Sequence, residues 1–200
     1  MRVRATVVDL RGDQPRSTDE VWVDTNVWLV LAYTRVPCER RLEPYAKYVK
    51  SLLGVRAKLA AGTVNIAELA RCVEFKEREI FEAANGVRFS SIKEFRKSGG
   101  RVVAAQAIKD AWSVLTTLAT LSPYAVQSAH VSAAADGMLS GDFLDGGDAV
   151  QLAEARQRGL ALVLSDDSDF ATVEGITLLT ANERVLRLAN EQQRLERTRG

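Results

Sequence analysis

Residues 160–170 read LALVLSDDSDF, an apolar run followed directly by a cluster of acidic residues. The apolar residues at 160–164 predict a central strand that is covered on both faces. A second β-rich run, EVWVD at residues 20–24, also ends in a carboxylate. Helical patterns of ten or more residues separate the expected strands, which implies crossover connections and a parallel sheet. The sequence therefore predicts an α/β protein in which acidic side chains gather at the carboxyl edge of the sheet.

Turn residues and helical periodicity delimit the other expected elements. Further strands are predicted at residues 3–10, 63–66, 125–131 and 176–179. Helices are predicted at residues 27–34, 43–61, 67–84, 90–97, 102–121, 132–139, 149–158 and 182–197.

The composition is that of a globular protein with a core of its own. The chain has 200 residues, of which 46% are hydrophobic and 26% are charged, and it needs no disulfide or structural metal to fold. Its two cysteines, Cys38 and Cys72, are too few for a disulfide framework or a cysteine-based zinc site. No apolar run is long enough to span a bilayer, and the N-terminus lacks the pattern of a secretory signal. We therefore expect a cytoplasmic protein without a membrane partner.

The charges are unevenly distributed although the net charge is only +1. Residues 35–58 contain seven basic and two acidic residues, whereas residues 136–174 contain nine acidic and two basic residues. This asymmetry is compatible with two solvated faces, or with a basic surface for nucleic acid beside an acidic site.

Four acidic residues stand where a parallel sheet would collect them. Asp24 ends one expected strand, and Glu68 lies at the start of an expected helix. Asp148 lies in the first turn of another helix, and Asp167 follows a second strand. Like charges at short distance repel one another unless a cation lies between them. Hard oxygen ligands without histidine or cysteine favour Mg²⁺ or Mn²⁺, and either ion can activate water at a phosphate. The chain has a single histidine, so a Ser-His-Asp or histidine–zinc mechanism is disfavoured.

Each acid also has a purely structural interpretation. Asp24 and Asp145 occur where helix caps are expected, and Glu68 and Asp148 suit the first turn of a helix. The acids at residues 166–169 suit an ordinary loop. The order and context of the four acids together favour a metal site over these separate interpretations.

Four motifs resemble those of the PIN-domain nucleases, in the order found in that family. They are VDTN at residues 23–26, NIAEL at 65–69, DAVQLA at 148–153 with the later Arg158-Gly159 pair, and LVLSDDSDF at 162–170. The resemblance covers about residues 20–179, and the last two motifs in tandem are its most specific part.

The resemblance implies a three-layer α/β/α sandwich with a central parallel sheet and a site for Mg²⁺ or Mn²⁺. Carried over by position, the catalytic and metal-binding acids would be Asp24, Glu68, Asp148 and Asp167. Asn26 and Ser165 would orient Asp24, and Asp169 would be a supporting acid. Asp145 is the reserve for the third acid, since a one-turn shift of the helix start would exchange the two.

The resemblance also implies an endoribonuclease that cleaves RNA phosphodiester bonds with metal-activated water. The RNA backbone would be held by the charges of Arg40, Arg41, Lys47 and Lys50. Many relatives are VapC-like toxins of toxin–antitoxin pairs, so a protein antitoxin and a second copy of the chain are further expected partners.

The chain is longer than the compact toxins of this family. We expect residues 1–19 to form an N-terminal extension, and residues 20–200 to form a single PIN-like nuclease domain. A helical insertion is expected around residues 86–122. The insertion leaves open whether the protein is a toxin, and it does not affect the nuclease assignment.

Two other functions remain open. An aspartate-dependent phosphatase would use Asp24 as its nucleophile, but it would need a second aspartate two residues later, where the chain has Asn26. A non-catalytic PIN-like module that binds nucleic acid or a protein partner would have no reason to keep all four acids.

Overall fold

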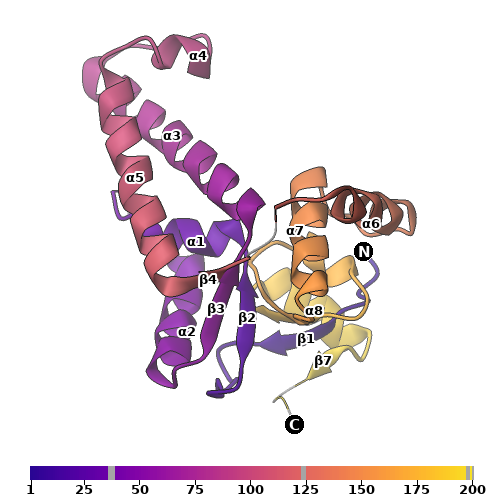
Figure 1. The fold of residues 1–200 in the computed structure, drawn as a ribbon. Helices are drawn as coiled ribbons and strands as arrows, with labels where there is room; N and C mark the ends of the chain where they lie inside the picture. The colour runs from indigo at the N-terminus through magenta and orange to yellow at the C-terminus, as the bar shows by residue number, and fades with distance from the viewer. Residues whose placement is uncertain (36–38, 123–124, 197–198, 200) are drawn as a thin grey trace.

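A parallel sheet runs through the centre of the protein (Figure 1). The computed structural model describes residues 1–35, 39–122, 125–196 and 199. Within these residues seven strands lie in the order β4-β3-β2-β5-β6-β1-β7, and all neighbouring strands pair in parallel. The strands are β1 (Thr6–Asp9), β2 (Glu20–Val23), β3 (Lys58–Ala61), β4 (Ala119–Leu121), β5 (Leu162–Leu164), β6 (Thr177–Thr180) and β7 (Leu195–Glu196). The predicted α/β class and central parallel sheet are confirmed.

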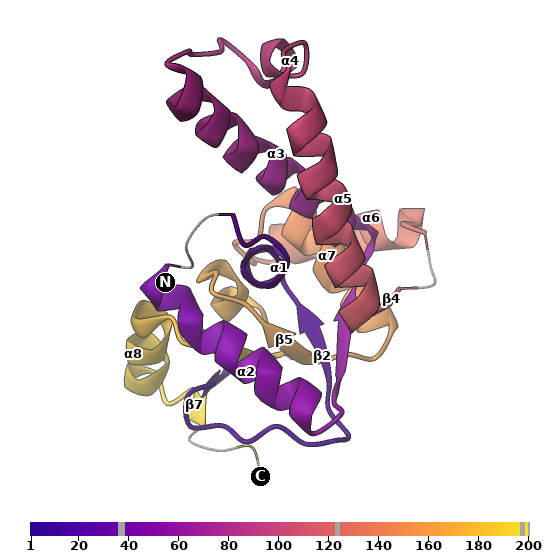
Figure 2. The same cartoon turned by 90° about the vertical axis from the view of Figure 1, so that its left-hand side faces the viewer.

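Helices cover both faces of this sheet (Figures 1 and 2). They are α1 (Thr25–Ala32), α2 (Glu43–Gly54), α3 (Thr63–Asn85), α4 (Ile92–Phe95), α5 (Gly100–Leu118), α6 (Ser128–Leu139), α7 (Gly146–Gln157) and α8 (Glu183–Glu191). Neighbouring strand residues point to opposite faces. Val21 and Val23 therefore join the buried cluster beneath α1, α2, α3 and α5, whereas Trp22 joins the cluster beneath α6, α7 and α8. These two apolar clusters hold the three layers together.

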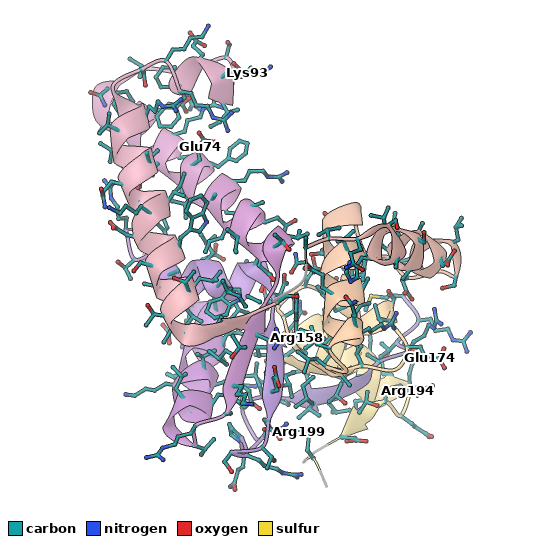
Figure 3. The ribbon with its side chains drawn as sticks, in the orientation of Figure 1. Glu74, Lys93, Arg158, Glu174, Arg194 and Arg199 are labelled. Carbon is teal, nitrogen blue, oxygen red and sulfur yellow. The ribbon has the colours of Figure 1, made fainter. Side chains whose placement is uncertain are left out.

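Helices α3 and α5 pack against each other and extend together away from the sheet, with α4 at their far end (Figure 2). The rings of Phe81, Phe89 and Phe95 pack at this far end, with centroids 5.5–6.0 Å apart. Glu74 of α3 accepts a hydrogen bond from Nε of Arg96 at 2.6 Å, which ties the end of α4 to α3 (Figure 3). The chain then returns along α5 to the sheet as β4.

Segments near the two ends of the chain lie side by side in the sheet, where β1 pairs with β7. Strand β1 lies between β6 and β7, so residues 1–19, predicted as an extension, contribute a strand to the central sheet. The guanidinium of Arg199 pairs with Asp13 at 2.6 Å and with Asp19 at 2.9 Å (Figure 3). These ion pairs fasten the C-terminal segment to the loop that connects β1 with β2.

The predicted secondary structure is wrong for the residues just before and just after residue 62. The helix predicted at 43–61 ends at Gly54, residues 58–61 form β3, and the strand predicted at 63–66 is the first turn of α3. Arg56, with a φ of 62°, lies in the turn between α2 and β3. The KLAA sequence of β3 has no local strand preference. It becomes a strand because β2 and β4 offer it partners on both sides.

Three other predicted elements also differ from the structure. The helix predicted at 102–121 ends at Leu118, and residues 119–121 form β4 beside β3. Residues 125–131 were expected to be a strand, but α6 begins at Ser128, and the Gln127 N–H donates to the ring Nδ1 of His130 at 2.8 Å. The helix predicted at 182–197 ends at Glu191, because the chain turns and pairs with β1 as β7. At residues 119–121 and 195–196, pairing with another strand outweighs the local helical pattern, whereas the bond from Gln127 to His130 favours the start of a helix at residue 128.

No helix in the described ranges is long and apolar enough to cross a membrane. Cys72 is a partly buried free thiol. Cys38 lies outside the described residues.

Candidate metal centre

The carboxyl ends of β2 and β5 meet at one point of the sheet edge. Val23 is paired with Leu164, and the Asp24 N–H donates to the Leu164 carbonyl at 3.0 Å. Asp24 and Ser165 are the first residues after the two strands, so the sheet places their side chains next to each other. Strand β3, on the other side of β2, leads into α3, which carries Glu68. The topology thus brings three of the four sequence motifs to one edge.

Asp24 is held by donors on both of its carboxylate oxygens. It caps α1, with Oδ1 accepting from the Thr25 N–H at 2.6 Å. Oδ2 accepts from the Ser165 hydroxyl at 2.5 Å and from the Asn26 amide at 2.6 Å. The residue is only 4% exposed. The pKa of Asp24 is raised to about 7, chiefly by burial and also by the charges of Asp167 and Glu68, while the bonds from Ser165 and Thr25 act in the opposite direction.

Three other carboxylates converge beside it, at the start of α7. One oxygen each of Glu68, Asp145 and Asp148 lies within 4.8 Å of the others. Asp145 caps α7, its Oδ1 accepting from the Gly147 N–H at 2.7 Å and from the Asp148 N–H at 3.0 Å. Asp145, the reserve for the third acid, therefore lies in the same group as Asp148 and caps the helix as well.

The pKa of Asp148 shows how close the acids are to one another. It is raised to about 8, first by burial and then by the charges of Asp24, Asp145, Glu68 and Asp167. All four sequence-predicted acids therefore share one electrostatic environment. Asp24 and Asp167 do not belong to the close group of oxygens, but their charges act on Asp148.

The three acids of the loop after β5 differ in their contacts: Asp167 and Asp169 contact residues of the same loop, whereas Asp166 contacts residues outside it. The Asp167 N–H donates to the Ser165 hydroxyl at 2.9 Å, and the Asp167 carboxylate accepts from the Asp169 N–H at 2.8 Å. Burial and the charge of Asp167 raise the pKa of Asp169. Asp166 instead accepts from the Tyr45 hydroxyl at 2.9 Å and pairs with Arg41. Asp166 thus ties the loop to α2.

The four basic residues predicted to hold RNA lie in two places. Arg40 and Arg41, in the short helical turn Arg40–Leu42, line an open cavity of about 600 Å³ next to Asp166. Arg11 and Arg184 line the same cavity. Lys47 and Lys50 are exposed on α2, away from this lining. Of the four predicted residues, Arg40 and Arg41 therefore lie beside Asp166, whereas Lys47 lines an adjoining cavity that shares Arg11 and Pro44 with this one.

Three polar residues at the site were not singled out from the sequence. The Thr25 hydroxyl donates to Glu68 Oε2 at 2.9 Å, and the Gln151 amide donates to the same oxygen at 2.7 Å. Asn65 donates to Gln151 Oε1 at 2.5 Å. The one available signal was the spacing of three between Asp148 and Gln151, which places both on one face of α7.

The donor set fits a hard divalent cation. Every acidic ligand offers oxygen, with no nitrogen or sulfur in the group, which is the chemistry that Mg²⁺ and Mn²⁺ prefer. Mutual repulsion and burial disfavour the charged forms of Asp24 and Asp148. A cation among these oxygens would offset that repulsion.

No protein-family model matches the sequence, and no curated protein sequence matches it. The fold is similar to that of VapBC2 from Rickettsia felis, solved with a DNA fragment from its promoter, at a TM-score of 0.50 and 12% identity, covering 80% of this chain and 98% of that one. VapC20 from Mycobacterium tuberculosis, described as a sarcin-ricin loop cleaving toxin, has a TM-score of 0.47 and 16% identity, with coverages of 76% and 92%. FitAcB from Neisseria gonorrhoeae has a TM-score of 0.46 and 17% identity, with coverages of 80% and 96%. By its motifs and its fold, the chain resembles the PIN-domain nucleases.

Proposed function

We propose that the protein is a Mg²⁺- or Mn²⁺-dependent endoribonuclease that cleaves RNA phosphodiester bonds with metal-activated water. The observation that carries this proposal is the group of carboxylate oxygens from Glu68, Asp145 and Asp148, within 4.8 Å of one another. Asp24 and Asp167 add their charges to this group from the ends of two neighbouring strands. Such a concentration of like charge has a physical reason to persist when a cation occupies it.

The chain's own residues would prepare the site in distinct ways. Glu68, Asp145 and Asp148 would hold the cation, and Asp24 and Asp167 would complete the negative field. When bound, the ion supplies activation of water and stabilisation of charge at the phosphate. Asp148, with a pKa of about 8, is mostly protonated at neutral pH without metal, so cation binding would release its proton.

The arginine-lined cavity beside Asp166 would receive the RNA backbone. Arg40 and Arg41 line it together with Arg11 and Arg184, and their charges would offset the repulsion between RNA and the acidic site. Lys47 and Lys50 would extend this basic surface along α2. Phosphate contacts of this kind position a strand and carry no sequence information.

We extend the proposal to a cytoplasmic toxin of a toxin–antitoxin pair, with a protein antitoxin and a second copy of the chain as partners. The fold shared with VapBC2 supports the toxin part of this proposal. A small neighbouring gene for a DNA-binding protein would favour the toxin over an RNA-processing enzyme. The phosphatase alternative gains no support, because Asn26 donates its amide to Asp24 and offers no second acid.

The direct test is incubation of the protein with a mixed RNA across a Mn²⁺ titration. We expect cleavage that rises with Mn²⁺, stops with chelator and leaves 5′-phosphate ends. Mn²⁺ binding without RNA cleavage would retain the metal centre and reject the ribonuclease. Absence of both would reject the proposed function as a whole.

Replacing Arg40, Arg41, Lys47 and Lys50 by alanine is expected to weaken binding of single-stranded RNA, measured in chelator so that none is cleaved. Each lost phosphate contact should lower the slope of log affinity against log salt by about 0.7. We expect Arg40→Ala alone to weaken RNA binding more than Lys47→Ala, because Arg40 lines the cavity beside Asp166 and Lys47 does not. Unchanged affinity and slope in the quadruple variant would remove this segment from the RNA path.

Gly147→Ala is expected to weaken Mn²⁺ binding by about 10–100-fold, the range typical of changes beside a metal ligand. A Cβ at this position would lie 2.5 Å from Glu68 Oε1, so the carboxylate would have to leave its position. Gly146→Ala is the matched control, since its Cβ would meet nothing within 4 Å in the same helical turn. Calorimetric titration measures both variants, and equal affinities would show that Glu68 does not hold the ion.

A further inference from the structure

Gln151 of α7 links two of the converging acids through a single amide group. Its Nε2 donates to Glu68 Oε2 at 2.7 Å and, at a longer distance of 3.4 Å, to Asp148 Oδ1. The residue is 0% exposed, so no water competes for these bonds. A buried amide is costly unless all of its groups have partners, and here both hydrogens and the oxygen are used.

The orientation of this amide follows from a backbone group at the start of α3. The Gly62 N–H, which can only donate, donates to Asn65 Oδ1 at 2.8 Å. The Asn65 amide nitrogen must therefore point the other way, where it donates to Gln151 Oε1 at 2.5 Å. The Gln151 oxygen is occupied by this donor, so its nitrogen faces the carboxylates. The hydrogen bonds from Gly62 to Asn65 and from Asn65 to Gln151 therefore fix which side of each amide donates and which accepts.

Each carboxylate keeps an oxygen that this network does not use. On Glu68, Oε2 accepts from both Gln151 and Thr25, whereas Oε1 faces the first turn of α7 close to Gly147. On Asp148, the contact with Gln151 involves Oδ1 alone. The network thus fixes one side of each carboxylate and leaves the other side available.

We propose that Gln151 is a positioning residue, oriented by Asn65, that holds Glu68 and Asp148 in the arrangement that binds the cation. This inference rests on the metal centre of the proposed function. Packing alone would accept an apolar side chain between α3 and α7, so the amide is explained by its polar partners, which are the two carboxylates and the Asn65 amide that orients it. A carboxylate at position 151 would add a further like charge, whereas the neutral amide donates to two acids without changing their total charge.

The experiment compares two variants of α7 by calorimetric Mn²⁺ titration. Gln151→Met keeps the length of the side chain and removes both its donors and the oxygen that accepts from Asn65. Gln157→Met is the matched control, because Gln157 lies on the same helix and contacts His130 instead of an acid. We expect Mn²⁺ affinity to fall by about 10–100-fold in Gln151→Met and to stay unchanged in Gln157→Met. Raising the Mn²⁺ concentration should then restore cleavage in Gln151→Met, since the ligands themselves are intact.

The outcomes separate this inference from the proposed function. If wild-type protein does not bind Mn²⁺, the metal centre itself is wrong. If wild-type and Gln151→Met bind Mn²⁺ equally, the metal centre stands and the positioning role is overturned. Gln151→Leu is measured in parallel, with circular dichroism and thermal unfolding in chelator as the readout of folding. If both Gln151 variants unfold without metal, the glutamine is a structural residue and the inference is also overturned.

Discussion

Asp148→Asn is expected to lower Mn²⁺-dependent RNA cleavage by roughly 10³-fold. The variant would lose several kcal/mol of transition-state stabilisation by the metal, and each loss of about 1.4 kcal/mol slows the reaction tenfold. The same variant should be more stable than wild type when no metal is present. Asp148 has a raised pKa, caused by burial and by the charges of Asp24, Asp145 and Glu68 around it. Asparagine removes one of the repelling charges and retains a side chain of similar shape.

The expected gain in metal-free stability at pH 8 is about 1–2 kcal/mol, which for a chain of this size raises the unfolding midpoint by roughly 2–8 °C. Thermal unfolding in chelator measures the gain, and cleavage assays with Mn²⁺ measure the loss of activity. Asp136→Asn is the control, since it removes one acidic charge from an exposed position on α6. An Asp148→Asn variant that is destabilised without metal would show that the carboxylate is structural, and retained cleavage would exclude it as a ligand.

The metal-free protein is expected to lose about 3 kcal/mol of unfolding free energy between pH 5.5 and pH 8.5. Asp24 and Asp148 have pKa values of about 7 and 8 in the folded protein, well above those of aspartate in an unfolded chain. The folded state therefore binds more protons than the unfolded state in this interval, so stability falls as the pH rises. The expected loss of stability is smaller than the two pKa shifts alone would give, because Asp148 is partly exposed to solvent.

Among the other carboxyl groups with shifted pKa values, those of Asp166 and Asp169 are raised and act in the same direction, whereas Asp9 and Asp13 do not contribute in this interval. Burial raises the pKa values of Asp9 and Asp13, but hydrogen bonds outweigh it. Bonds to Arg11 lower the pKa of Asp9, and bonds to Arg199 and Tyr48 lower the pKa of Asp13. Both groups are therefore ionised throughout the interval and contribute equally at pH 5.5 and pH 8.5. Chemical unfolding in chelator at several pH values provides the measurement. Mn²⁺ should flatten the profile, and so should the double variant Asp24→Asn/Asp148→Asn. A flat profile in wild-type protein without metal would contradict the repulsion on which the metal centre is based.

Local patterns were sufficient for the strands and helices with strong signals of their own. The apolar run at 160–164 contains β5, and the EVWVD run at 20–24 contains β2 and ends at Asp24. Parallel strands with helical crossovers then require the ends of these two strands to lie at the same edge. The proximity of Asp24, Glu68, Asp148 and Asp167 followed from that topology, and the charges acting on Asp148 agree with it.

Residues 43–66 show where local patterns failed. The alanine- and leucine-containing run at 58–61 continues the periodicity of α2, yet it forms β3 between β2 and β4. Nothing near residues 58–61 in the sequence indicates these two partners. The free energy of pairing and of burying Leu59 and Ala60 comes from strands and helices distant in the chain.

The sequence by itself determined the α/β class, the parallel sheet and the set of acids at its carboxyl edge, because each depends on short patterns and on the order of strands. Only the tertiary structure decided which carboxylate oxygens converge. It joined Asp145 with Glu68 and Asp148, and it gave Asp24 an arrangement in which both oxygens accept hydrogen bonds. The bond between Asn65 and Gln151 spans 86 positions of the chain, and contacts at that separation exist only once α3 and α7 have packed side by side.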